Sequence, residues 1–194
     1  MKNILIPENN NGISVLTYIP NFFQLEEAQR IRKELDSIND WKTGYSDVGN
    51  KIQRRQKWYQ TNNQTFCKRW TKKHERWESH QYSSFLLKLQ NKLEKEIKKH
   101  LVEHQSVQIP EFNSLLINYY EDGNNFIPPH QDNKFSFGEI PTIALLSFGE
   151  TRKFILERTH YNVCKRNKEE NHLNESFDLD DNSLFIMSGN VQQY

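Results

Sequence analysis

The second half of the chain carries short apolar runs with a strand-like period, and this pattern constrains the fold more than any other feature. From Asn113 onward, β-branched and aromatic residues gather in runs that Gly, Asn, Pro or Asp separate. The runs are residues 114–120, 142–148, 153–157, 175–179 and 183–187. Because no helical pattern lies between them, we expect an antiparallel sandwich or barrel in place of a parallel sheet.

The first half of the chain has a helical period instead. A short strand-rich stretch over residues 1–20 precedes a predicted amphipathic helix over residues 24–38, in which apolar residues recur every three or four positions. A second helix is predicted from Ser83 or Ser84, either of which can cap it, to about residue 104. Its apolar stripe consists of Phe85, Leu86, Leu89, Leu93, Ile97 and Leu101.

Residues 41–82 form an insert that is rich in aromatic and basic residues. Between Lys51 and Trp77 there are nine Lys or Arg residues and one acidic residue, Glu75, whereas the whole chain has a formal charge of +1. Any electrostatic signal for nucleic acid is therefore local to this insert. A merely basic, solvated surface loop is the alternative interpretation.

Length and composition limit the class of protein. A chain of 194 residues is the size of one domain, for which we expect a supporting strand and helix over 1–40, the insert over 41–82 and the main core over 83–194. Cys67 and Cys164 are too few for a disulfide framework or a thiolate zinc site. No apolar stretch is long enough for a membrane span or a signal peptide, so we expect a soluble intracellular protein of the cytoplasm or nucleus.

A short His-x-Asp motif is the clearest chemical signal. In an extended segment, His130 and Asp132 point to the same side and can reach one ion. An imidazole and a carboxylate are two of the three ligands in the facial triad that holds non-heme Fe(II). A turn histidine beside a surface aspartate is the alternative, because the motif alone is weak.

The surrounding motifs resemble those of the AlkB-type Fe(II)/2-oxoglutarate dioxygenases, which remove alkyl groups from nucleic-acid bases. The family order of an N-x-Y strand, a D-G turn, H-x-D, an S-x-G strand end and an R-x-F strand is present. The matching residues are Asn118-Tyr119-Tyr120, Asp122-Gly123, His130-Gln131-Asp132, Ser147-Phe148-Gly149 and Arg152-Lys153-Phe154. The resemblance implies an α+β protein whose double-stranded β-helix (jelly-roll) core carries N-terminal helices and a basic, aromatic-rich nucleotide-recognition lid, the insert.

The resemblance also implies roles for individual residues. His130 and Asp132 would be iron ligands, and Asn118 and Tyr120 would hydrogen-bond the co-substrate 2-oxoglutarate. Arg54 and Arg55 would contact the nucleic-acid strand from the lid. The implied activity is oxidative dealkylation of alkylated bases in DNA or RNA, single-stranded or flipped out of the stack, as in repair or demethylation. We expect a monomer that requires Fe(II) and 2-oxoglutarate.

Two departures from the family pattern keep other functions open. The family's second histidine ligand and its 2-oxoglutarate-binding arginines follow the late glycine turn, whereas here only residues 190–194 follow Gly189, so we expect a family member cut short. Lys134 also stands where many members carry an acid. The alternatives are an inactive nucleic-acid-binding remnant and a 2-oxoglutarate dioxygenase that acts on a protein or a small molecule.

Overall fold

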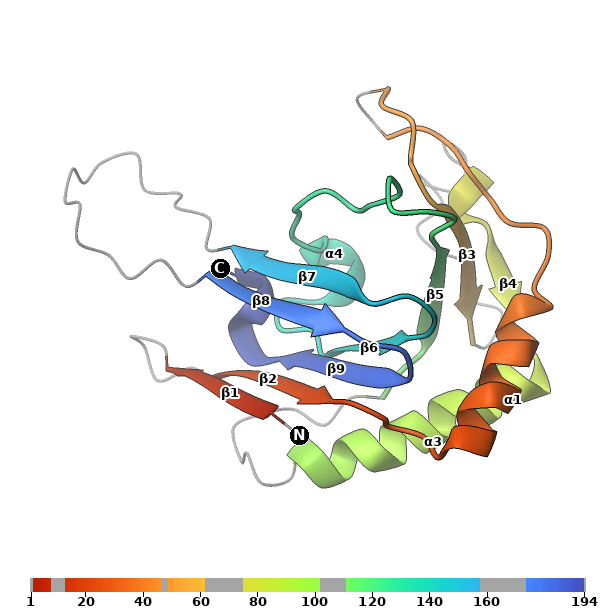
Figure 1. Cartoon of the computed structure of the whole chain (residues 1–194). Coiled ribbons are helices and arrows are strands. Elements are labelled where there is room, and N and C mark those ends of the chain that lie inside the picture. The colour runs from red at the N-terminus through yellow and green to blue at the C-terminus, as the bar shows by residue number, and fades with distance from the viewer. Residues whose placement is uncertain are drawn as a thin grey trace. The chain divides into compact units, whose positions relative to one another are not determined.

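A computed structural model describes residues 2–7, 13–46, 49–61, 75–101, 111–157 and 174–193. In this part, the chain is a mixed α+β protein with several small sheets (Figure 1). Its internal contacts divide it into two compact units, each with buried residues of its own. The first unit contains Met1–Asp36, Ser106–Gln108 and Gln131–Tyr194, and the second contains Ser37–Gln105 and Ile109–His130.

The first unit is built on a four-stranded antiparallel sheet that joins the beginning and the end of the sequence. Its spatial order is β1-β2-β9-β6, so the late strand β9 lies between strands from distant parts of the chain. These strands are β1 (Lys2–Pro7), β2 (Ile13–Ile19), β9 (Ser183–Ser188) and β6 (Ile143–Ser147). A second, two-stranded sheet pairs β7 (Arg152–Glu157) with β8 (Asn174–Leu179).

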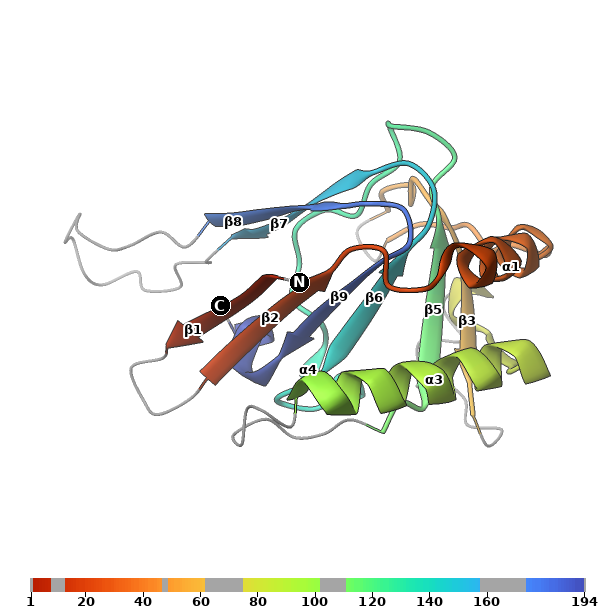
Figure 2. The same cartoon turned by 60° about the horizontal axis from the view of Figure 1, so that its bottom comes forward.

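An aromatic and aliphatic core fills the space between these two sheets. Figure 2 shows β7 and β8 as a layer facing the layer of β2, β9 and β6. Phe185 of β9 is fully buried, and its ring centroid lies 4.6 Å from that of Phe177 and 5.2 Å from that of Phe154. Leu16 and Met187 belong to the same cluster. The expected antiparallel sandwich is therefore present in the first unit.

Asn182 fastens the turn before β9 to the segment that leads into helix α1 (Leu25–Asp36). Its side chain accepts a hydrogen bond from the Phe23 amide at 3.0 Å and donates one to the Phe23 carbonyl at 2.7 Å. The Asn182 carbonyl also accepts from the Phe22 amide at 2.7 Å. Asn182 has a φ of 56°, a left-handed conformation that asparagine tolerates better than most residues.

The second unit has a three-stranded sheet of order β4-β3-β5 and a long helix, α3. β3 pairs antiparallel with β5 and parallel with β4, and η1 precedes β4. The elements are β3 (Arg55–Gln60), η1 (Glu75–Trp77), β4 (Ser79–Gln81), α3 (Ser84–Leu101) and β5 (Ser114–Tyr119).

Side-chain hydrogen bonds fasten α3 to the segment that enters β5. Ser83 caps the helix by accepting a hydrogen bond from the Leu86 amide at 3.2 Å, as the sequence predicts. Gln90 donates to the Phe112 carbonyl at 2.5 Å, and Glu94 accepts from the Phe112 amide at 2.9 Å. The position of β5 is thus fixed from both the helix and β3.

Two sequence expectations need amendment. A short helix, α4 (Lys134–Phe137), lies between β5 and β6 where no helical pattern is visible, because Asn133 caps it through a 2.9 Å bond from the Phe135 amide. The predicted strand over residues 114–120 does not pair with the strands of the sandwich, because it forms β5 and shares a sheet with β3 of the insert. The lid role of the insert remains a prediction, and residues 62–74 of it lie outside the described residues.

Among the described residues, no helix is both long and apolar enough to cross a membrane.

We predict that Phe185→Ala lowers the free energy of unfolding by about 3–5 kcal/mol, because it leaves a cavity between the two sheets. Urea titration of the chain measures the change. Ile155→Ala on β7 is the matched control, since Ile155 is 53% exposed, and we expect it to cost about 0.5 kcal/mol or less. Equal losses for the two variants would contradict this description of the core.

Candidate functional site

Asn118, which is predicted to hydrogen-bond 2-oxoglutarate, is positioned by β5 and by a buried arginine. In the register of the sheet, Asn118 lies opposite Gln56 of β3, which is fully buried. The Arg54 Nε donates a hydrogen bond to Asn118 Oδ1 at 2.7 Å. An arginine can only donate, so the carboxamide must present its oxygen to Arg54 and its Nδ2 elsewhere. Asn118 is therefore held as an oriented hydrogen-bond donor.

Arg54 is 9% exposed, although the sequence suggests a basic contact on the protein surface. Burial lowers the pKa of the Arg54 guanidinium from its ordinary value, and the electrostatic interaction with Tyr120 partly opposes this shift in pKa. The group stays cationic at neutral pH, because a guanidinium does not lose its proton in proteins. In the part of the chain that is described, no carboxylate pairs with Arg54. A direct strand contact from Arg54 remains a prediction, and the geometry shows it orienting Asn118.

Tyr120 directly follows β5 and is half-buried. Because side chains alternate along an extended segment, Asn118 and Tyr120 point to one side and Tyr119 to the other. The N-x-Y motif therefore places its asparagine and its tyrosine on one face of the chain and its middle residue on the opposite face. Tyr119 is 42% exposed.

His130 is exposed, and its Nδ1 lies 2.9 Å from the Pro128 carbonyl oxygen. A carbonyl oxygen can only accept, so in this contact Nδ1 carries the proton. The Nε2 of the neutral ring then presents its lone pair, which is the form in which an imidazole binds a metal. This backbone partner is invisible in the H-x-D motif, because it depends on how Pro128-Pro129 turns the chain.

Asp132 is half-buried, and its backbone amide donates to Gln192 Oε1 at 2.9 Å. Gln192 lies in η2 (Gly189–Gln193), the turn after β9. Asn133, the next residue, caps α4, so the backbone of Asp132 is held on both sides. No spacing in the sequence pointed to Gln192, because its contact with Asp132 joins residues 60 apart.

The assignment of His130 and Asp132 as metal ligands stays a prediction. Among those described, no three His, Cys, Asp or Glu side chains are grouped so that they could hold an ion. His130 belongs to the second unit and Asp132 to the first. The donor types fit, since a neutral imidazole and a carboxylate are the ligands that non-heme Fe(II) sites use.

Arg55 and the aromatic residues of the insert differ in their exposure to solvent. Arg55 is half-exposed, and its Nη2 lies 2.8 Å from each carboxylate oxygen of Glu121. Trp58 and Tyr59 are buried, where they pack against Trp77 and Tyr82 with ring centroids 5.7 and 6.2 Å apart. These two rings form the core of the second unit and are not available for base stacking.

Comparison with known proteins gives consistent similarities. The profile of the 2OG-Fe(II) oxygenase superfamily matches residues 15–194. Alpha-ketoglutarate-dependent dioxygenase alkB homolog 3 of Bos taurus is 30% identical over 191 residues, covering 93% of this chain and 58% of that protein. The Homo sapiens protein of the same name is 29% identical over the same shares. DNA oxidative demethylase ALKBH2 of Arabidopsis thaliana is 40% identical over 47 residues, 24% of this chain and 15% of that protein. The chain spans 58% of the length of the alkB homolog 3 proteins from cattle and man.

We predict that Asn118→Ala lowers the free energy of unfolding by about 2 kcal/mol, because it leaves the buried Arg54 guanidinium without its acceptor. Chemical denaturation measures the loss. Asn124→Ala in the exposed turn after β5 is the control, and we expect a change within about 0.5 kcal/mol. If Asn118→Ala were as stable as Asn124→Ala, the hydrogen bond from Arg54 would not contribute to the fold.

Proposed function

The chain belongs to the 2OG-Fe(II) oxygenase superfamily, and we propose that it uses Fe(II) and 2-oxoglutarate to dealkylate bases of DNA or RNA oxidatively. The observation that carries this proposal is the similarity to the alkB homolog 3 proteins over 93% of the chain. The name of the Arabidopsis relative, DNA oxidative demethylase ALKBH2, supports nucleic acid as the substrate class. We propose a single-stranded or flipped-out target base, since the reacting atom is out of reach inside a duplex.

The family implies a double-stranded β-helix, and we propose this fold for the core. This proposal is supported by the packing of the sheet β1-β2-β9-β6 against the sheet β7-β8, with Phe185 in the core between them. We also propose that the insert over 41–82 acts as the nucleotide-recognition lid, which the half-exposed position of Arg55 supports.

In this proposal, His130 and Asp132 supply two iron ligands. His130 would use Nε2, because its Nδ1 proton is committed to the Pro128 carbonyl. Asp132 would use its carboxylate, while the bond between its amide and Gln192 holds the backbone in place. Bound Fe(II), together with 2-oxoglutarate and O₂, would supply the oxidation of the alkyl group.

Asn118 and Tyr120 would bind 2-oxoglutarate through side-chain hydrogen bonds. Arg54 fixes Asn118 so that its Nδ2 donates, and a 2-oxoglutarate oxygen is a suitable acceptor. Tyr120 follows on the same side of the chain and would add its hydroxyl. Arg54 acts in this scheme as a positioning residue, since its Nε contacts Asn118.

We predict that Asp132→Asn and His130→Ala each reduce turnover at least about 100-fold, because each removes an iron ligand. The assay measures formaldehyde and succinate released by the protein from an N-methylated single-stranded oligonucleotide. Anaerobic calorimetry with Fe(II) follows metal binding separately. Asp178→Asn, which changes an exposed carboxylate on β8, is the control and should retain wild-type turnover and iron affinity.

The alternative functions give different results in the same assay. Binding of the oligonucleotide without succinate release would indicate a non-catalytic binding protein. Succinate release with no binding of any oligonucleotide at low salt would indicate a protein or small-molecule substrate. Either result would overturn the proposed function.

We predict that Arg55→Gln weakens binding of single-stranded DNA and lowers the slope of log K against log salt by about 0.7, as loss of one phosphate contact requires. Fluorescence anisotropy of a labelled strand over a salt series measures both. Lys153→Gln also removes one exposed positive charge, from the first unit, and should leave the slope unchanged. An unchanged slope for Arg55→Gln would exclude a phosphate contact from this residue.

A further inference from the structure

The sheet face opposite Asn118 presents an exposed aromatic ring beside a cation. Arg55 and Tyr119 are register partners across β3 and β5, so their side chains share one face, and Gln56 and Asn118 occupy the other. The Arg55 Cζ lies 5.6 Å from the centroid of the Tyr119 ring. The Trp41 ring packs against Tyr119 at 5.5 Å between centroids, with 35° between the planes. We call Trp41, Arg55 and Tyr119 the Tyr119 ledge.

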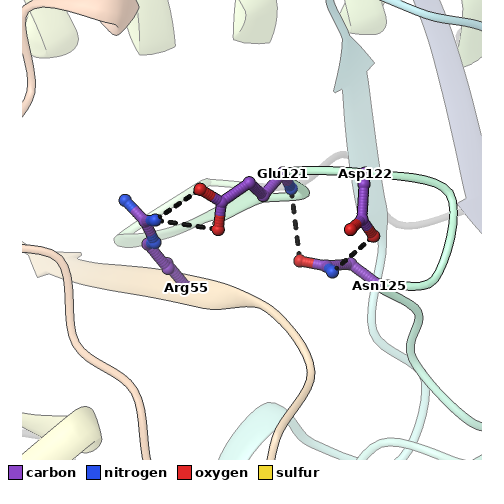
Figure 3. A network of polar contacts seen from close by, with 4 residues as sticks. All are labelled: Arg55, Glu121, Asp122 and Asn125. Atoms are coloured by element: carbon purple, nitrogen blue, oxygen red, sulfur yellow. Dashed lines mark hydrogen bonds and ion pairs between the residues drawn. The ribbon is translucent and has the colours of Figure 1, made fainter.

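A network of hydrogen bonds in the turn after β5 holds the Arg55 side chain of the ledge (Figure 3). Glu121 receives both of its bonds from Arg55 Nη2, and its amide donates to Asn125 Oδ1 at 3.2 Å. Asn125 in turn donates to Asp122 Oδ1 at 2.9 Å. An exposed ion pair of this kind adds little stability, so its main consequence is to restrict where Arg55 lies. Arg55 is therefore positioned before any ligand arrives, which lowers the entropic cost of binding.

The chemistry of the ledge fits an unpaired nucleobase on a phosphate backbone. Tyr119 is 42% exposed although Arg55 and Trp41 already lie against its ring, and the part of the ring that they leave exposed can stack with a base of any sequence. Arg55 uses only Nη2 for Glu121, so within the described structure its Nη1 and Nε donors have no hydrogen-bond partner. Lys57 lies two residues along β3 on the same face and adds a second positive charge. Glu121 balances the charge of Arg55, so Lys57 leaves this face with a net positive charge, which favours an anionic strand over an apolar protein segment.

We propose that the Tyr119 ledge is a second contact site for the nucleic-acid strand, at which a base flanking the target stacks on Tyr119. This inference rests on the proposed function. It places the flanking base on the sheet face opposite Asn118 and Tyr120, the residues proposed to bind 2-oxoglutarate. Tyr119 would then contribute to strand affinity without contacting the reacting atoms.

The test compares binding of two labelled strands, an unmodified oligothymidylate and an abasic strand of the same length, by fluorescence anisotropy. Tyr119→Leu should bind the oligothymidylate about five- to tenfold more weakly than the wild type, the loss expected for one base–ring stack. It should bind the abasic strand like the wild type, with the same salt slope, because no charge changes. Tyr119→Phe keeps the ring and should bind within about twofold of the wild type.

Tyr45→Leu is the matched control, because Tyr45 is 60% exposed in the same unit but outside the ledge. It should leave both affinities unchanged, and thermal unfolding of each variant checks that the second unit remains folded. Equal binding of oligothymidylate by Tyr119→Leu and the wild type would overturn the ledge alone. Failure of the wild type to bind either strand would overturn the proposed function as well. An equal loss in Tyr45→Leu would show non-specific aromatic adsorption and would also reject the ledge.

Discussion

The pairing of β9 on both of its edges is the constraint on which the first unit depends. β9 binds β2 on one side and β6 on the other, so residues near the two ends of the sequence share a continuous hydrogen-bonded sheet. Every residue of β9 is buried, and Phe185 places its ring between the two sheets. The Asn182 bonds to Phe22 and Phe23 then fix the turn before the strand. Residues from β2 and β9 therefore reach the core only when the whole sheet forms.

The pairing of β3 with β5 is the corresponding constraint in the second unit, because it sets which side chains meet on each face of the sheet. One face brings buried Gln56 beside Asn118, which Arg54 orients, and the other aligns Arg55 with Tyr119. Side chains alternate along each strand, so a slip of one residue would exchange the faces and separate both pairs. The register that orients a proposed co-substrate residue also builds the proposed strand-binding ledge. A substitution on one face is therefore expected to change either co-substrate binding or strand binding alone, provided that it keeps this register.

A backbone carbonyl and a side-chain amide position the two proposed iron ligands before any metal is present. The Pro128 carbonyl selects the His130 tautomer that leaves Nε2 as the donor atom. Gln192 holds the amide of Asp132 from the turn that follows β9. Such contacts, which orient the ligands, affect metal affinity without touching the metal. They connect the sheet built on β9 with the chemistry proposed for the family.

The sequence alone determined the elements whose signals are local. The periods of the apolar runs located the late strands and both long helices, the cap of the second helix was narrowed to Ser83 or Ser84, and ordered motifs identified the family. The short helix α4 was missed because four residues show no period and a single cap, Asn133, sets it. Only the tertiary structure decided that Arg54 is buried against Asn118, that Trp58 belongs to a core, and that Trp41 meets Tyr119. The reason is physical: periodicity and capping act between residues a few positions apart, whereas burial and side-chain pairing depend on which distant strand lies alongside.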